Sequence, residues 1–313
     1  MLSYPTLIQQ ASSIICNSRP ASYFKEWKDF TDSWSPILGI PEEIIQISGA
    51  NLAGATDDLF DETLSEQALS QLYEEMNALT YLQPAQDYLN SLVTDDALSL
   101  EEAIKVHIAF LTTEGYRLQV EAGKDILAKQ WLTGWQTVMD AYNTQQVDTV
   151  RTLLRAKEPP KTSASFAEGV ALYLNRFSKT DAVSLSIIGG FPFSPLASTE
   201  LLEGLLELAP SISYLYRLVE DIEYDSTERI NAGVFATSIE AGISMDEAYR
   251  NILSGNPLSS DVQQRLQIIG RTSAKDFQCQ LDRLLNNHSP DDNYNILLHV
   301  GKKLHSIAIA VIS

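Results

Sequence analysis

Four acidic residues fall within six positions in the segment ATDDLFDE, directly after a stretch of small and apolar residues. They are Asp57, Asp58, Asp61 and Glu62. Residues four apart share one face of a helix, so Asp57 pairs with Asp61 and Asp58 with Glu62. Carboxylate oxygens are preferred ligands of Mg²⁺, and acids at a helix C-terminus are unfavourable unless a cation offsets them. The cluster therefore predicts a divalent cation site. The alternative is that TDD caps a new helix beginning at Asp57.

A second acidic segment reads EDIEYDSTE, and it follows the apolar stretch ISYLYRLV. On a helix Glu220, Tyr224 and Glu228 lie along one face. Asp221, Asp225 and Glu228 lie along a neighbouring face. The acidic face thus continues from a stretch that is apolar enough to be packed, and its like charges repel one another. This pattern favours a second cation site, and a solvated acidic face is the alternative.

Together the two segments resemble the metal motifs of class I terpene synthases. DDLFD is similar to the Asp-Asp-x-x-Asp motif of that family, and RLVEDIEYDSTE is similar to its second metal motif. The segment TSIEAGISMDEAYRNI resembles a run that follows the second motif in the plant enzymes. The resemblance covers residues 40–255. It implies an all-α helical bundle of the class I terpenoid synthase fold, with residues 1–313 as a single domain.

The resemblance also implies an activity, that of a terpene synthase or cyclase, a carbon-oxygen lyase acting on diphosphates. Such an enzyme ionises an allylic prenyl diphosphate, here farnesyl or geranylgeranyl diphosphate, at a Mg²⁺ cluster and cyclises the carbocation to a hydrocarbon or alcohol. Three Mg²⁺ ions are expected, with Mn²⁺ as a substitute. The implied metal ligands are Asp57, Asp58, Asp61, Glu62, Glu220, Asp221, Tyr224, Asp225 and Glu228. Tyr224 stands where Ser or Thr is usual, and because a phenol is a poor Mg²⁺ ligand, Asp225 is the alternative.

Basic residues are expected to bind the diphosphate. Arg176 lies 221 − 176 = 45 residues before Asp221, close to the spacing of a diphosphate-sensing Arg in the bacterial enzymes. Arg217, Arg229 and Lys179 are further candidates. The alternative for Arg176 is a solvated side chain that compensates a helix dipole. The implied catalytic residues are Asp57, Asp58, Asp61, Arg176 and Glu228.

Helices must position these candidate residues, and the composition of the sequence favours helices. Leu, Ala, Ile, Glu and Gln dominate between the helix breakers, and alternating runs are scarce. Ser99 with Glu102, and Ser244 with Glu247, are typical of helix starts. The IIGGFPF segment at 187–193 predicts a helix interruption that lines the pocket, with free carbonyls facing a cation. Aromatic rings that could stabilise a carbocation, although each is more often simple core, are Phe60, Phe110, Trp131, Trp135, Phe191 and Tyr214.

Composition narrows the function classes. The formal net charge of −19 would repel nucleic acid and an anionic membrane surface, so neither is an expected partner. An anionic substrate such as a prenyl diphosphate requires bridging cations. Cys16 and Cys279 are too few for a disulfide framework, and no signal peptide or long apolar run is apparent. We therefore expect a cytoplasmic protein with reduced thiols and no stable membrane anchoring, and a homodimer is left open.

Two other functions stay open. A head-to-head prenyl transferase of the squalene or phytoene synthase type would use Asp57–Asp61 and Asp221–Asp225 as paired Asp-x-x-x-Asp motifs. A catalytically decayed helical interaction protein is the other, and Tyr224 at a ligand position is its main support. Condensation doubles the carbon count of the substrate whereas cyclisation keeps it. A decayed site would show no Mg²⁺-linked affinity for diphosphate.

Overall fold

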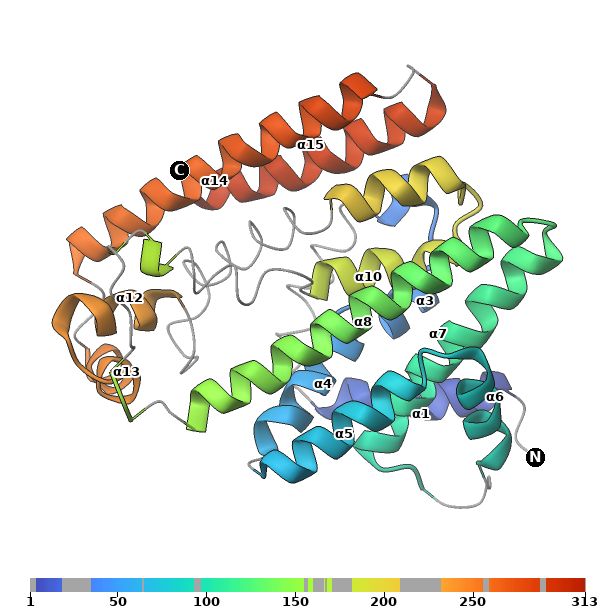
Figure 1. Cartoon of the computed structure of the whole chain (residues 1–313), viewed down its shortest axis with the longest axis horizontal. Coiled ribbons are helices and arrows are strands. Elements are labelled where there is room, and N and C mark those ends of the chain that lie inside the picture. Colours follow the sequence, from blue (N-terminus) through green and yellow to red (C-terminus); the bar gives the residue numbers. More distant parts are fainter. Residues whose placement is uncertain are drawn as a thin grey trace.

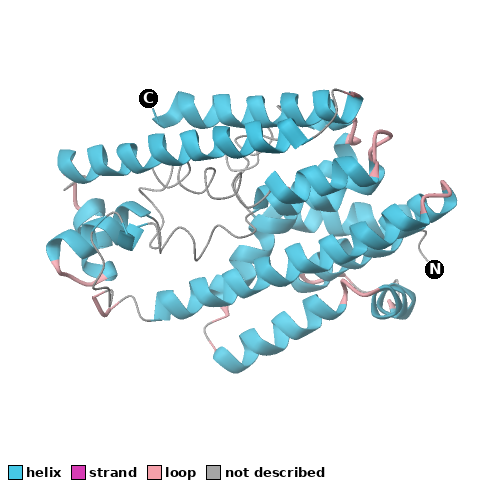
Figure 2. Ribbon diagram, turned by 45° about the horizontal axis from the view of Figure 1, so that its top comes forward, coloured by secondary structure: helices cyan, strands magenta, loops and turns pink. Residues whose placement is uncertain are grey.

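The computed structural model describes residues 4–18, 35–63, 65–92, 97–154, 157–159, 166, 168–170, 182–208, 232–255, 259–287 and 291–312. These ranges form helices joined by short loops and contain no strand, which confirms the all-α fold class (Figure 2). None of the described helices is both long enough and apolar enough to cross a bilayer. The elements are α1 Tyr4–Ser18, α3 Glu42–Ser48, α4 Ala50–Glu62, α5 Glu66–Ala78, α6 Leu82–Ser91, α7 Leu100–Glu121, α8 Asp125–Leu154, α10 Ala182–Gly190, the 3-10 helix η1 Phe191–Phe193, α12 Ala232–Ala241, α13 Met245–Leu253, α14 Ser260–Asn287 and α15 Asp292–Ile312.

Helix starts follow the local capping chemistry. The Ser99 hydroxyl accepts a hydrogen bond from the backbone N–H of Glu102 at 3.2 Å, and the Glu102 carboxylate accepts one from the Ser99 N–H at 2.7 Å. This reciprocal pair is the predicted capping box at the start of α7. The Ser244 hydroxyl likewise accepts from the N–H of Glu247 at 3.1 Å at the start of α13. Both predicted helix starts are therefore confirmed.

The long helix α8 crosses the molecule and contacts α4, α5, α7 and α10 (Figure 1). The Trp131 indole N–H donates to the carbonyl of Ile188 at 2.7 Å, which ties α8 to α10. The Trp135 indole N–H donates to the hydroxyl of Thr112 at 3.0 Å, which ties α8 to α7. The two indole rings stack with centroids 6.3 Å apart. Because both buried indoles have hydrogen-bond partners, they pack in the core without an unsatisfied polar group.

The predicted interruption at 189–193 is confirmed, because α10 ends at Gly190 and the 3-10 helix follows. A Cβ atom on Gly189 would lie 2.9 Å from the Trp135 ring, so a side chain here would disturb the packing of α10 on α8. The expectation of free carbonyls is wrong at two positions. The carbonyl of Ile188 accepts the indole N–H of α8, and that of Pro192 accepts the amide of Gln119. Both carbonyls are therefore occupied by hydrogen-bond donors from neighbouring helices.

The two longest C-terminal helices, α14 and α15, form a hairpin along one edge of the molecule (Figures 1 and 2). A Cβ atom on Gly301 would lie 2.6 Å from a methyl group of Leu281, so the two helices approach closely there. Leu297 packs on Gly204 and joins the hairpin to the helical residues 199–208. A smaller apolar cluster of α12, α13 and the first turns of α14 lies apart from the main core.

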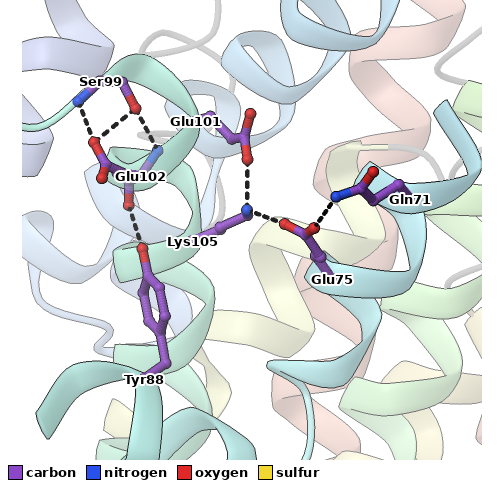
Figure 3. A network of polar contacts seen from close by, with 7 residues as sticks. All are labelled: Gln71, Glu75, Tyr88, Ser99, Glu101, Glu102 and Lys105. Atoms are coloured by element: carbon purple, nitrogen blue, oxygen red, sulfur yellow. Dashed lines mark hydrogen bonds and ion pairs between the residues drawn. The ribbon is translucent and has the colours of Figure 1, made fainter. Parts of the chain in front are cut away.

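A polar network joins α5 to the first turns of α7 (Figure 3). The Lys105 ammonium forms ion pairs with Glu101, at 2.5 Å, and with Glu75. Burial alone would lower the pKa of Lys105, but the hydrogen bonds to the two carboxylates outweigh it and the pKa is raised. Hydrogen bonds from Lys105 and then from Gln71 lower the pKa of Glu75. The ion pair between Lys105 and Glu75 therefore links α5 to α7.

Candidate functional site

The first acidic cluster lies at the C-terminal end of α4. This helix runs unbroken through Ala50–Glu62, and inside it the hydroxyl of Thr56 donates to the carbonyl of Leu52 at 2.7 Å. The prediction that the acids end a helix of small and apolar residues is therefore confirmed. The alternative, a new helix capped at Asp57, is wrong, because the backbone is already helical before that residue.

The acids lie where α4 leaves the core. Leu52, Ala53 and Phe60 are buried, whereas Asp57 and Asp58 are partly exposed. The last turn of the helix includes the backbone of Asp61 and Glu62. Two neighbouring carboxylates at the boundary of the core can bind a hard cation and still contact a second ligand from outside. Their charge adds to the negative end of the helix dipole, so a cation would be attracted to this point.

The helix α8 passes beside α4 just before the acids. The Tyr142 hydroxyl, which is buried, donates to the carbonyl of Ala53 at 2.7 Å. Asp57 lies four residues after Ala53, and one helical turn advances the chain by about 5.4 Å. Both helices run toward the left of the view in Figure 1. The acidic end of α4 therefore lies beside the C-terminal half of α8.

The buried side chains of α8 change character along its length. The N-terminal half presents Trp131, Trp135 and other apolar side chains to the core. The C-terminal half still contributes Tyr142, Val147 and Val150 to the core. It also buries polar residues, which are Asn143, Gln145, Gln146 and Thr149. Within the described part of the chain no hydrogen-bond partner reaches either amide atom of Asn143 or the amide oxygens of Gln145 and Gln146. Buried polar atoms nearly always have a hydrogen-bond partner, so these amide atoms are exceptions to the rule.

Sequence reasoning missed this polar stretch of α8. The only available signal is the run YNTQQVDT, which interrupts the apolar face that the two Trp residues begin. Amides are common on exposed helix faces, and for that reason the run alone does not indicate burial. Asn143, for which the exposed fraction is zero, shows that the interpretation as a surface face would be wrong.

The second acidic segment and the basic candidates fall outside the residues that the structure describes. These positions are Arg176, Lys179, Arg217, Glu220, Asp221, Tyr224, Asp225, Glu228 and Arg229. Tyr214 also lies outside them. The facing of the two acidic clusters therefore stays a prediction. In the described ranges alone, no group of three or more His, Cys, Asp or Glu side chains is arranged to hold a metal ion.

The aromatic candidates that the structure describes belong to the core. Phe60, Trp131, Trp135 and Phe191 are fully buried, and Phe110 stacks on Phe193 with ring centroids 6.3 Å apart. The indole N–H groups of both Trp residues are engaged by neighbouring helices. The two Trp residues therefore fix α8 in place beside α7 and α10.

His107 is a buried titratable residue on α7, in the part of that helix that packs against α1. Its Nε2 lies 3.2 Å from the hydroxyl of Ser12, and within the described chain its Nδ1 has no partner. Burial lowers the pKa of His107 to about 3, so the ring is neutral at physiological pH. Cys16 and Cys279 form no disulfide, as expected for reduced thiols. Neither finding adds a ligand to the acidic end of α4.

Comparison with known proteins gives no significant match to a family model, to a curated protein or to a solved structure. The resemblance to class I terpene synthases therefore depends on the two acidic segments and their order along the chain. The all-α architecture is compatible with that family, and its specific fold remains a prediction.

Proposed function

We propose that this protein is a Mg²⁺-dependent class I terpene synthase that acts on farnesyl or geranylgeranyl diphosphate. The main support is the location of Asp57 and Asp58 at the end of a packed helix, in an all-helical protein. A bound cation would interact favourably with both carboxylates and with the carbonyl end of the helix dipole. The second acidic segment supplies the other half of the proposed metal site.

The donor set fits the cation. Mg²⁺ prefers carboxylate oxygens and keeps several water ligands, which the partial exposure of Asp57 and Asp58 allows. Bound Mg²⁺ would stabilise the negative charge that develops on the leaving diphosphate. In this proposal Arg176 and Arg229 bind the diphosphate oxygens and orient the substrate. The buried apolar helices around α4 exclude water from the reacting carbon atoms.

The proposed reaction balances without a redox partner. The allylic C–O bond breaks, and the diphosphate leaves with the electron pair. The remaining carbocation closes a ring by attack of an internal double bond. Loss of a proton then gives a hydrocarbon, and addition of water with loss of a proton gives an alcohol. Neither route changes the number of carbon atoms, which makes carbon count the decisive observable.

The test is incubation of the purified protein with geranyl, farnesyl and geranylgeranyl diphosphates, with and without Mg²⁺, followed by mass spectrometry of the organic extract. We expect a Mg²⁺-dependent product with the carbon count of its substrate. A product with twice that count would replace the proposal with head-to-head condensation. Absence of product from all three substrates, together with absence of Mg²⁺-linked diphosphate binding, would support the decayed interaction protein instead.

A further inference from the structure

The contact between α1 and α7 buries a histidine that is only half paired. The His107 side chain is fully buried, and its Nε2 lies 3.2 Å from the hydroxyl of Ser12 on α1. Within the described residues its Nδ1 has no hydrogen-bond partner. A neutral imidazole carries one donor and one acceptor, so it leaves a single nitrogen unpaired here. Protonation would add a charge and a second N–H donor, and a buried charge is costly unless a partner compensates it.

In the described chain, no charged side chain compensates a protonated His107. Burial is the cause of the lowered pKa of this residue. Helix α1 contains no Asp, Glu, Lys or Arg. Titratable residues on α1 and the helices around it include Tyr4 and Cys16 on α1, Asp57 and Asp58 on α4, Asp87 and Tyr88 on α6, and Lys105 and Glu114 on α7. Lys105 and Glu114 are the charged residues of α7 nearest to His107 in the chain, and both form ion pairs with other residues. A proton on His107 therefore destabilises the contact between α1 and α7.

Helix α1 depends on this contact for its stability. Its buried residues Leu7, Ile8, Ala11 and Ile15 share one face, and the helix packs on α7 and α4. Isolated helices of this length are marginal in water, so the 15 residues of α1 stay helical chiefly because the helix is docked. The long helix α8, in contrast, packs on α4, α5, α7 and α10 (Figure 1). Separation of α1 from α7 therefore requires less free energy than unfolding of the whole protein.

We propose that α1 is an acid-sensitive helix, which undocks from α7 when His107 takes up a proton, while the other described helices stay folded. The exposed imidazole of the undocked form titrates near pH 6.5, whereas burial in the docked form lowers the pKa of His107 to about 3. The contribution of His107 to docking is thus complete above pH 6.5 and decreases as the pH falls below it. Between pH 7.5 and pH 5.5 the equilibrium constant for undocking should rise about 10-fold. Undocking exposes the apolar face of α1. This inference does not rest on the proposed function.

The test is hydrogen exchange of the full chain at pH 7.5, 6.5 and 5.5, followed by mass spectrometry of its peptides. Dividing each exchange rate by the chemical rate at that pH gives an opening constant. Peptides from α1 should have larger opening constants than peptides from residues 131–142 of α8, because α1 opens separately. The α1 constants should rise about 10-fold from pH 7.5 to pH 5.5. Equal constants for α1 and α8, or a rise of less than about threefold for α1, would overturn the inference.

Two variants separate protonation of His107 from loss of its hydrogen bond. His107→Gln keeps a polar side chain that does not titrate, so its α1 opening constant should change less than about twofold over this pH range. Ser12→Ala removes the hydrogen bond and keeps the imidazole. Its opening constant should be several-fold higher at each pH and should still rise about 10-fold on acidification. A full pH dependence in His107→Gln would assign the effect to other groups and overturn the inference.

A second measurement needs no variant. In NMR spectra of the wild-type protein, the ring signals of His107 in the docked form should remain those of a neutral imidazole at pH 5.5. A ring that is already protonated while α1 is docked would overturn the inference, because no proton would then be taken up on undocking.

Discussion

At the scale of single residues, the proposed function depends most on the acidic end of α4. Asp57 and Asp58 are adjacent, partly buried and placed at the negative end of a helix dipole. A second residue, His107, is buried as a neutral ring in the contact between α7 and α1. Each leads to a prediction that a substitution can test.

Replacing Asp57 by Asn should lower turnover of the preferred prenyl diphosphate by about 100-fold or more, because one charged ligand of the cation is lost. Initial product rates from mass spectrometry would measure the effect, and circular dichroism should show unchanged helix content. Asp276→Asn on the exposed face of α14 is the control and should keep the full rate. Full activity of the Asp57 variant would remove this residue from the metal site.

The stability of the protein should depend on pH through His107. Burial lowers its pKa to about 3 in the folded protein, whereas the unfolded chain binds this proton near pH 6.5. The stabilisation is complete above pH 6.5 and is lost as the pH falls toward 3, by about 1.4 kcal/mol per pH unit. Urea unfolding between pH 7 and pH 5 should show this slope. His107→Gln should reduce it, and equal slopes would show that His107 does not contribute.

At the scale of elements, the position of the candidate site depends on how α8 packs. Its indoles bind α7 and α10, and its Tyr142 binds α4 one turn before the acids. At Gly189 the backbone of α10 lies against the Trp135 ring. This contact is rigid on both sides, because the ring is fixed by its own hydrogen bond to Thr112.

Gly189→Ala should lower the free energy of unfolding by about 1–3 kcal/mol, since the new methyl group would lie 2.9 Å from the Trp135 ring. Gly134→Ala is the matched control, also in a packed helix. There the new methyl group would lie 3.2 Å from the flexible end of Leu206, which can move, and Ala has the higher helix propensity. Denaturant unfolding of both variants would measure the difference. Equal stabilities would contradict the rigid contact.

At the scale of the whole molecule, charge dominates. The net charge of −19 opposes compaction through self-repulsion and concentrates negative potential at acidic clusters. Salt screens such repulsion over distances of about 10 Å at 0.1 M. A protein that binds an anionic substrate under these conditions depends on cations for binding as well as for chemistry.

Raising NaCl from about 20 mM to about 500 mM should therefore raise the midpoint of thermal unfolding by several degrees. Mg²⁺ at a few millimolar should produce a further rise in the wild type that is absent from Asp57→Asn, because one effect is screening and the other is binding at a site. Scanning fluorimetry would measure both. A fall in the midpoint with salt would show that favourable ion pairs, such as those of Lys105, outweigh the repulsion.

Much of the local structure could be predicted from the sequence. Capping at Ser99 and Ser244, the break at 189–193 and the acids at the end of α4 all follow from interactions within about four residues along the chain. Carboxylate spacing on one helix is also a local property, and the cation binding that it indicates remains a prediction. The facing of the two acidic segments, and with it the terpene synthase activity, remains a prediction.

Only the tertiary structure decided which side chains share an environment. It showed the carbonyls of Ile188 and Pro192 engaged by donors from other helices, and it buried the amides of Asn143 and Gln146. The physical reason is the distance along the chain over which each interaction acts. Helix propensity and capping act between near neighbours, whereas burial depends on partners such as Tyr142 and Ala53, which are 89 residues apart in the chain. A run of amides looks the same in sequence whether its helix face is exposed or buried, and only the tertiary packing of α8 distinguishes the two.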